Sequence, residues 1–262
     1  MFVKSKKQKS IITTKSQIFN RLIICIISIT LSFLTSIFST FDNNDYTVLA
    51  FKPTVPSESI KSSSEYVFVR ELNIKDLNPF RDPGIGDIIL DSPGYIYVTD
   101  FGNHHVQKFD SDGNFITQWG SEGNGPGQFD FPHGIAVDSK DKVYVTDSQN
   151  NCCRIQKFNS DGNFITKWGS NGTGDGQFNG LYDIAIDSKD NVYVTDGGNS
   201  RIQKFDSNGN FITKWGSEGT DDGQFNILAH IAVDSEDNVY VTDFGNQNIQ
   251  KFNNYGNFIT KW

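Results

Sequence analysis

Residues 132–168 read PHGIAVDSKDKVYVTDSQNNCCRIQKFNSDGNFITKW, and this stretch decides the fold. It contains four short runs of strand-forming residues, over 134–138, 142–146, 154–158 and 163–168. The first run is small and apolar, as in a strand buried on both faces, whereas the later runs alternate apolar and polar residues. The sequences between them, Asp-Ser-Lys-Asp and Asn-Ser-Asp-Gly, are typical of hairpin turns. The stretch therefore predicts four short antiparallel strands.

The same pattern recurs along the chain. Tyr-Val-Thr-Asp occurs four times, ending at Asp100, Asp147, Asp196 and Asp243. Gly-Asn-Phe-Ile-Thr-x-Trp also occurs four times, and it holds every tryptophan of the protein, Trp119, Trp168, Trp215 and Trp262. Both motifs repeat every 47 to 49 residues. Four antiparallel strands in each such period predict the blade of a β-propeller, and so an all-β fold.

The repeat also resembles a known family. Gly127-Gln-Phe129, Pro132-His-Gly-Ile-Ala-Val-Asp138, Val143-Tyr-Val-Thr-Asp147 and Arg154-Ile-Gln-Lys-Phe158 together resemble the NHL repeat. The resemblance covers about residues 83–262. It implies blades at about 83–119, 132–168, 181–215 and 228–262. It says little about function, because propellers serve binding, sensing and catalysis alike.

The number of blades is the least certain part of this architecture. NHL propellers similar to this chain often have six blades, whereas four copies of the repeat are visible. Residues 66–72 resemble a fourth strand without the preceding three. We expect the propeller domain, 66–262, to hold four blades and one lone strand, as part of an incomplete six-bladed ring. A compact four-bladed ring and a ring completed between chains are the alternatives.

The N-terminal region differs from the repeats in composition. The first 41 residues carry six basic residues and no acid, and residues 22–38 form an uncharged apolar run. A spanning helix needs about 20 such residues, and a signal-peptide core about 7 to 15. We expect a basic cytoplasmic segment over 1–21, a signal-anchor or signal-peptide helix over 22–41 and a polar linker over 42–65. The propeller would then be membrane-anchored outside the cytoplasm, or secreted if the signal is cleaved.

Charge and cysteine content exclude two classes of protein. The net charge is −8 even with the basic N-terminal segment included, so the propeller itself is acidic. Nucleic-acid affinity comes mainly from Lys and Arg, and we therefore expect no nucleic-acid partner. Three cysteines exclude a disulfide framework. Cys152 and Cys153 are adjacent and form either a vicinal disulfide or two free thiols.

Positions that break the repeat are candidates for function. The residues just before the apolar triplet of each first strand vary from copy to copy, and they include Asp87, His133, Tyr182, Asp183 and His230. The innermost strand of a propeller begins near the mouth of the central channel. We therefore expect these side chains around one channel mouth, where they would bind a polar ligand or a cation. Ordinary loop polarity is the alternative.

A metal site is a second interpretation of the two histidines. The segment 132–138 is similar to part of the peptidyl-amidating lyases, propeller enzymes that hold zinc with histidines from alternate blades. His133 and His230 lie two repeats apart, so the resemblance implies a zinc pair that still lacks its third histidine. The turns at 110–114 and its copies superficially resemble calcium loops, but a glycine at a left-handed turn position explains them.

No catalytic nucleophile with a partner base is visible. The sequence thus predicts a membrane-anchored, extracytoplasmic NHL-type propeller that binds a protein or a small molecule on its top face, with the loops over 122–128 and 148–153 presented to the partner. The alternative is a metal-dependent propeller lyase or hydrolase.

Overall fold

The computed structural model describes residues 25–28, 35–42, 45–53, 66–73, 84–149 and 152–262, and the side chains of 84–148 and 153–262. Strands make up the regular structure of these residues, apart from one short 3-10 helix, η1, Gly197–Asn199. The described strands form five four-stranded antiparallel sheets and one parallel pair. The predicted all-β fold of four-stranded antiparallel blades is confirmed.

Each four-stranded sheet uses strands that are consecutive in the chain. The first contains β1 Cys25–Ser28, β2 Thr35–Asp42, β3 Asp45–Pro53 and β4 Tyr66–Asn73. The second contains β5 Ile85–Leu90, β6 Ile96–Asp100, β7 His105–Phe109 and β8 Phe115–Trp119. The third contains β9 Pro132–Val137, β10 Val143–Gln149, β11 Cys152–Phe158 and β12 Phe164–Trp168.

The last two sheets follow the same plan. The fourth contains β15 Leu181–Ile186, β16 Val192–Asp196, β17 Arg201–Phe205 and β18 Phe211–Trp215. The fifth contains β19 Leu228–Val233, β20 Val239–Asp243, β21 Asn248–Phe252 and β22 Phe258–Lys261. Between the third and fourth sheets, β13 Ser170–Asn171 pairs in parallel with β14 Gln177–Phe178.

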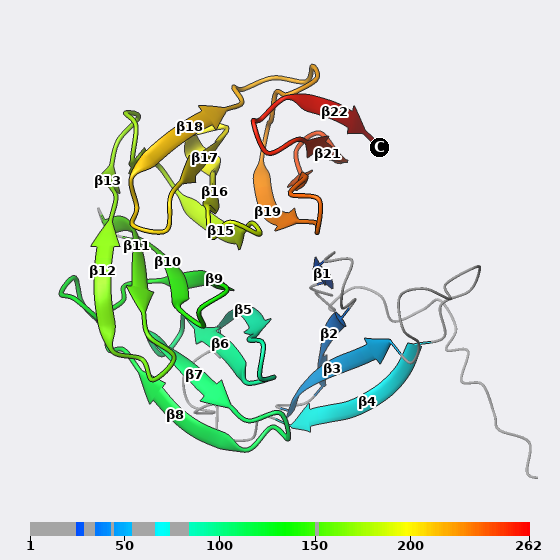
Figure 1. The fold of residues 1–262 in the computed structure, drawn as a ribbon, viewed down its shortest axis with the longest axis vertical. Coiled ribbons are helices and arrows are strands. Elements are labelled where there is room, and N and C mark those ends of the chain that lie inside the picture. The colour runs from blue at the N-terminus through cyan, green and yellow to red at the C-terminus, as the bar shows by residue number, and fades with distance from the viewer. Residues whose placement is uncertain (1–24, 29–34, 43–44, 54–65, 74–83, 150–151) are drawn as a thin grey trace, which may run out of the picture.

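The sheets are arranged around a common centre, as blades (Figure 1). The first strand of each blade lies innermost, so β5, β9, β15 and β19 line the centre, and the fourth strands β8, β12, β18 and β22 lie at the rim. Neighbouring inner strands contact one another, β5 with β9, β9 with β15, and β15 with β19. Residues about 48 positions apart in the sequence therefore lie close together near the central axis.

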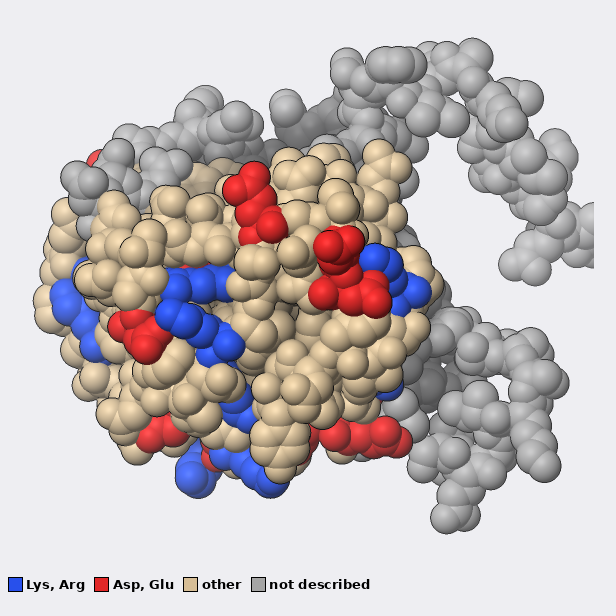
Figure 2. Space-filling model, turned by 90° about the horizontal axis from the view of Figure 1, so that it is seen from above, with Lys and Arg blue, Asp and Glu red and all other residues tan. Residues whose placement is uncertain are grey.

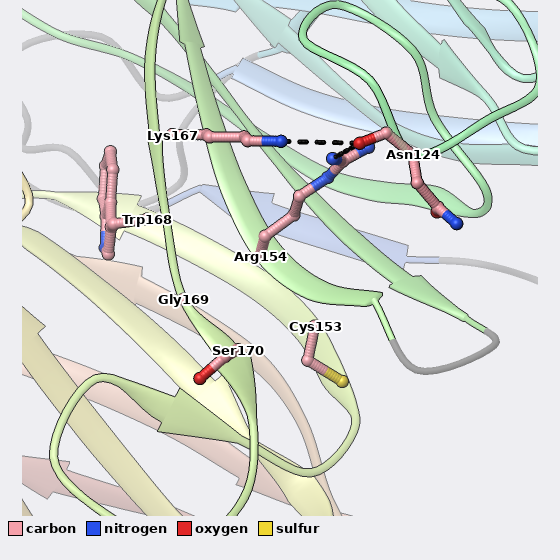
Figure 3. Close-up of a pocket in the computed structure, with 7 residues that line it drawn as sticks. All are labelled: Asn124, Cys153, Arg154, Lys167, Trp168, Gly169 and Ser170. Carbon is pink, nitrogen blue, oxygen red and sulfur yellow. Dashed lines mark hydrogen bonds between the residues drawn. The ribbon is translucent and has the colours of Figure 1, made fainter.

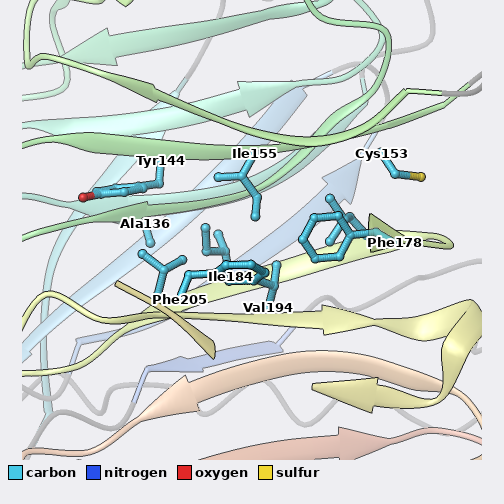
Figure 4. Close-up of a cluster of buried hydrophobic side chains, with 10 residues drawn as sticks. Ala136, Tyr144, Cys153, Ile155, Phe178, Ile184, Val194 and Phe205 are labelled. Carbon is cyan, nitrogen blue, oxygen red and sulfur yellow. The ribbon is translucent and has the colours of Figure 1, made fainter. Parts of the chain in front are cut away.

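Blades pack against each other through a seam that repeats. Between the third and fourth blades, Tyr144 and Ile155 face Ile184, Val194 and Phe205 (Figure 4). At the outer end of that seam, Trp168 lies 6.0 Å, centroid to centroid, from Phe205, which is fully buried.

Gly209, in the next blade, lies against the same indole, because a Cβ there would lie 2.5 Å from the Trp168 ring. The contact recurs at Trp119 with Phe158 and Gly162, and at Trp215 with Phe252 and Gly256. The tryptophans therefore occupy one equivalent position in successive blades.

The first sheet corrects the expectation of four blades and a lone strand. β4 covers the predicted fourth strand, but it pairs with β3, which pairs with β2, which pairs with β1. The repeated motifs do not predict this sheet, because its strands carry no Tyr-Val-Thr-Asp sequence. The sequence Asp42-Asn-Asn-Asp45 joins β2 to β3, and Asn is a residue that tolerates tight hairpin turns.

β1 and β2 lie within residues 22–41, where the sequence predicts a helix, and β3 lies within the predicted linker. The apolar run is rich in isoleucine and threonine, which also suit strands. Residues 1–24 and 29–34 lie outside the described residues, so the signal or anchor role of the segment stays a prediction. A search of the described residues for a helix long and apolar enough to cross a membrane found none.

The surface carries both signs of charge. On the face seen in Figure 2, Lys and Arg groups lie among Asp and Glu groups. Ion pairs in the described part of the chain include Lys214 with Asp175 at 2.6 Å and Lys261 with Asp222 at 2.8 Å. The expectation that nucleic acid is not a partner stays a prediction.

Candidate functional site

The threonine of each Tyr-Val-Thr-Asp motif ties the inner strands together. The Thr99 hydroxyl accepts a hydrogen bond from the Asp87 amide at 2.8 Å and donates one to the His133 carbonyl of the next blade at 2.6 Å. Thr146 makes the same link from Gly134 to the Tyr182 carbonyl, and Thr195 from Asp183 to Ala229. The residues that follow these carbonyls are thereby held at a fixed place on the axis.

Two aspartates bridge pairs of blades at this level. Asp87, in β5, accepts hydrogen bonds from the amides of Ile88 in its own blade at 2.7 Å and Ile135 in the next at 3.1 Å. Asp183, in β15, accepts from Ile184 at 2.8 Å and from Ile231 of the next blade at 2.9 Å. Each carboxylate thus presents both oxygens to backbone donors from two strands.

The intervening blade leaves room for this approach. Gly134 holds the position in β9 that Asp87 and Asp183 hold in theirs. A Cβ on Gly134 would lie 2.8 Å from the Cα of Asp183, so a side chain there would push β9 and β15 apart. The alternation of aspartate and glycine therefore follows from how closely the inner strands pack.

The two histidines complete the group. His230, in β19, places its Nδ1 3.4 Å from Asp183 Oδ2. His133, in β9, places its Nδ1 3.0 Å from the carbonyl oxygen of Tyr182. Tyr182 is 46% exposed, whereas Asp183 is buried. The five residues predicted from the sequence thus lie on the four inner strands, and we call them the channel-mouth cluster.

The electrostatics of the cluster are shared among its members. Burial, and then the negative charge of Asp183, raise the pKa of Asp87 to about 7. The hydrogen bond with Asp183 raises the pKa of His230 above its usual range. Burial lowers the pKa of His133. At neutral pH the cluster therefore holds one carboxyl that changes its protonation state readily, and one acid–imidazole pair.

Two aromatic residues beside the cluster were missed by sequence reasoning. The Phe101 and Phe131 rings lie 4.5 Å apart, the Phe131 and His133 rings 6.2 Å, and the His133 and Tyr182 rings 6.1 Å. We call these four residues the aromatic row. Phe101 could have been found, because it follows the Tyr-Val-Thr-Asp motif at a position where the other copies have Ser148, Gly197 and Phe244.

The residues described do not fit the zinc centre that the lyase resemblance implies. Nowhere in the described part of the chain do three His, Cys, Asp or Glu side chains come together as a metal-binding group. His133 and His230 each have one ring nitrogen beside a protein oxygen, and these oxygens belong to different residues. The histidines serve the cluster as single hydrogen-bonding groups.

The turns that superficially resemble calcium loops are ordinary hairpins. Asp110 accepts hydrogen bonds from the amides of Asp112 at 2.9 Å and Asn114 at 2.8 Å, and Gly113 has φ of 77°. The carboxylate of Asp110 thus caps its own turn, and the left-handed glycine is the one the sequence predicts.

The cysteine pair is described only in part. Cys153 is buried near the start of β11. The side chain of Cys152 lies outside the described residues, so the choice between a disulfide and two thiols stays open.

Comparison with known proteins gives matches to propellers. The family model described as "6-bladed beta-propeller" matches residues 39–153, 138–206 and 188–261. Rat peptidylglycine alpha-amidating monooxygenase is 38% identical over 82 residues, which cover 29% of this chain and 8% of that protein. Human NHL repeat-containing protein 3 is 32% identical over 77 residues, which cover 28% of this chain and 22% of that protein. The chain therefore spans less than a quarter of each of these relatives.

Solved structures share the architecture at low sequence identity. A streptogramin B lyase superimposes with a TM-score of 0.58 at 17% identity, over 87% of this chain and 64% of that one. The virginiamycin B lyase from Staphylococcus aureus gives 0.58 at 13% identity, over 93% and 74%. At this identity the likeness shows the fold.

Proposed function

Because the chain belongs to the six-bladed β-propeller family, with NHL-repeat proteins among its relatives, we propose that it is a binding module for a polar ligand at its channel mouth. The blades supply a rigid ring of strands. The varied residues at the start of the inner strands supply the recognition. The wider role would be that of a ligand- or protein-binding sensor.

One observation carries this proposal. The blades repeat closely in their strands and turns, yet one equivalent position holds three residue types in four blades, Asp87, Gly134, Asp183 and His230. The fold brings these residues close together near the central axis. Asp183 accepts a hydrogen bond from β19 and lies close to His230. Divergence at a position where the blades converge is what an added site on a repeated scaffold predicts.

The chemistry of the cluster favours a particular kind of ligand. Asp87 and Asp183 offer acceptor oxygens, and the aromatic row offers ring faces beside them. Carboxylates attract ammonium groups, and aromatic faces attract both cations and flat apolar groups. The ligand that fits best is an amine, or another hydrogen-bond donor, attached to a flat apolar group.

The proposed setting is the outer side of a membrane. The basic stretch followed by the apolar run over 22–38 supports an anchor or a cleaved signal. Alkaline extraction of membranes from cells that express the full chain tests this. An anchored chain stays with the membrane pellet, and a chain released by the wash, or found in the medium, is not anchored.

A titration with phenethylamine tests the ligand site. The probe should shift the imidazole NMR signals of His133 and His230 with a millimolar dissociation constant, and its N-acetylated form, which lacks the charge, should bind at least tenfold more weakly. Tyr182→Ala and Asp183→Asn should both weaken binding, whereas Asp206→Asn, in a distant exposed turn, should leave it unchanged. Equal binding of the charged and acetylated probes, or no effect of Asp183→Asn, would contradict the proposal.

A propeller lyase or hydrolase is the second candidate. The 38% identity to an amidating monooxygenase over 82 residues favours it. Metal analysis of the purified full chain distinguishes the two. Stoichiometric zinc or calcium, lost in both His133→Ala and His230→Ala, would favour the enzyme over the binding module.

A further inference from the structure

A lysine precedes the tryptophan in the third, fourth and fifth blades, and in two of them it has an equivalent partner. Lys214, before Trp215, pairs with Asp175 at 2.6 Å, and Lys261, before Trp262, pairs with Asp222 at 2.8 Å. Both aspartates lie at the same place in the loop that joins the fourth strand of one blade to the first strand of the next. The carboxylate is therefore a regular part of this loop in two blades.

The third blade has the lysine without the carboxylate. Lys167 is the equivalent of Lys214, and Pro126 stands where the aspartate would be. The Lys167 ammonium reaches the carbonyl of Asn124 at 3.4 Å, and no ion pair joins it to a carboxylate in the described part of the chain. The flanking Gly125 and Gly127 offer no side chain in exchange.

The neighbouring guanidinium of Arg154 does not alter the excess of positive charge at Lys167. Arg154 is buried and pairs with Asp147 at 2.9 Å, so its charge is compensated. Its remaining N–H groups donate to the loop carbonyls of Gly123, Asn124 and Gln128. Arg154 thus holds the loop in shape, and Lys167 contributes the uncompensated positive charge.

A cavity of about 380 Å³ lies beside Lys167. Its lining includes Lys167 and Arg154, which point toward the Asn124 carbonyl from one side, and Ser170 and Cys153 on the other (Figure 3). Trp168 also lines it. Pockets for small molecules begin at roughly 300 Å³, so the cavity accommodates an amino-acid side chain or a small organic acid.

We propose that this cavity binds the carboxylate of an external ligand, which takes the place that Asp175 and Asp222 hold in the other blades. Lys167 supplies the charge, and the Ser170 hydroxyl and Asn124 amide lie at the cavity as hydrogen-bond donors. The ligand is either a free small acid or an acidic side chain of a peptide. An exposed ion pair is weak, so the dissociation constant for one carboxylate falls in the millimolar range.

An NMR titration of the full chain, observed at the indole signal of Trp168, which lines the cavity and is present in every variant, tests the proposal. The probes are succinate, the peptide Ac-Gly-Asp-Gly-NH2, which copies the loop around Asp175, and its neutral counterpart Ac-Gly-Asn-Gly-NH2. We expect the acidic probes to shift the signal and the neutral peptide to bind at least tenfold more weakly. Tighter binding of the acidic peptide than of succinate identifies a peptide ligand, and the reverse a small acid.

Variants built from the repeat make the test specific. Lys167→Gln should abolish binding, and Pro126→Asp, which restores the internal partner, should weaken it at least tenfold. Lys214→Gln, which removes a lysine that is already paired, should leave binding unchanged. Asp175→Asn should free Lys214 and create a second site of similar affinity.

Two results would overturn the proposal. One is an acidic probe that binds Lys167→Gln as tightly as the original chain. The other is equal affinity for the acidic and neutral peptides. Lys167 is exposed, so its substitution keeps the test decisive even where Pro126→Asp disturbs the loop.

Discussion

The seams between blades and the channel mouth lie at opposite ends of the same sheets, and they treat the repeat differently. At the seams, tryptophan meets phenylalanine at 5.9, 6.0 and 5.9 Å in three successive interfaces. At the mouth, the equivalent positions hold aspartate, glycine, aspartate and histidine. The same tryptophan–phenylalanine contact thus occurs in three seams, whereas the mouth position holds three residue types in four blades.

The difference separates two kinds of constraint. A seam residue must fill a space bounded by two sheets, and close packing leaves few alternatives of the same volume. A mouth residue faces the axis, where backbone hydrogen bonds through Thr99, Thr146 and Thr195 already hold the strands. The side chains there differ between blades, and we therefore expect seam substitutions to cost more stability than mouth substitutions, whose main effect should be on binding.

The largest expected effect comes from a seam residue. Phe205 is fully buried against Trp168, Phe178 and Phe211. Phe205→Ala should lower the free energy of unfolding by about 3 to 5 kcal/mol, because it removes a ring and leaves a cavity. Urea denaturation followed by tryptophan fluorescence measures the loss.

Tyr182→Ala is the matched change at the mouth. The Tyr182 side chain is nearly half exposed, so its removal should change the free energy of unfolding by less than about 1 kcal/mol. The comparison would break if Tyr182→Ala cost as much as Phe205→Ala, since the mouth would then be a structural element rather than a variable one.

An effect smaller than that of Phe205→Ala is expected at Arg201, which fixes the loop over 173–177 and which we call the arginine clamp. Arg201 is buried and donates to Asp196 at 2.7 Å and to the carbonyls of Thr173, Gly174 and Gln177. Arg201→Met should cost about 2 to 3 kcal/mol, because it leaves these buried acceptors without their donor. Asp196 still accepts hydrogen bonds from the Asn179 amide and the Asn199 side chain, so the cost stays below that of a fully isolated charge.

Asn248 allows a control for this clamp. It replaces the arginine at the corresponding position of the fifth blade, where Asp243 accepts from the Asn246 side chain at 2.7 Å, as Asp196 accepts from Asn199. Asn248→Met should therefore cost less than half as much in the same urea titration. Equal losses at the two positions would show that the arginine clamp adds nothing specific.

The fold could be predicted from sequence because its signals are local. Tyr-Val-Thr-Asp and the tryptophan motif encode strands, turns and seam residues within one period, and the four blades that carry them form as expected. The first blade lacks both motifs, so only β4 was anticipated. Its other strands show that blade geometry tolerates sequences which keep strand propensity but lose the motif.

The site was predictable only in part. Asp87, Asp183 and His230 were found because they break the repeat, and the fold brings them together. Phe101 and Phe131 were not, since their contact depends on how adjacent blades turn toward each other. The cavity at Lys167 required distances, because the sequence alone does not show which acid pairs with which lysine.

The last expected effect is a difference in pH dependence between the mouth and the turns. Burial and the Asp183 charge raise the pKa of Asp87 to about 7, so its contribution to stability is complete below pH 3.8 and is lost as the pH rises toward 7. His230, whose pKa Asp183 raises, loses its contribution as the pH rises above 6.5. His133 acts oppositely just below pH 6.5, because burial lowers its pKa.

Asp187, at a turn, has the opposite sign. Burial acts to raise its pKa, but hydrogen bonds from Asn191 and Tyr193 outweigh burial and lower it. The stability that Asp187 contributes is present above pH 3.8 and is lost as the pH falls below that value.

Urea titrations at pH 3 to 8 separate these two contributions. Relative to Asp87→Asn, which has no proton to lose, the original chain should lose about 1 to 2 kcal/mol between pH 4 and 7, a figure discounted for the water that reaches a half-buried carboxyl. Asp187→Asn should leave that range unchanged and flatten the acid limb below pH 4. If Asp87→Asn retained the full loss between pH 4 and 7, the titrating group would be one other than Asp87. Asp87 would then not give the mouth the pH dependence of stability that its raised pKa indicates.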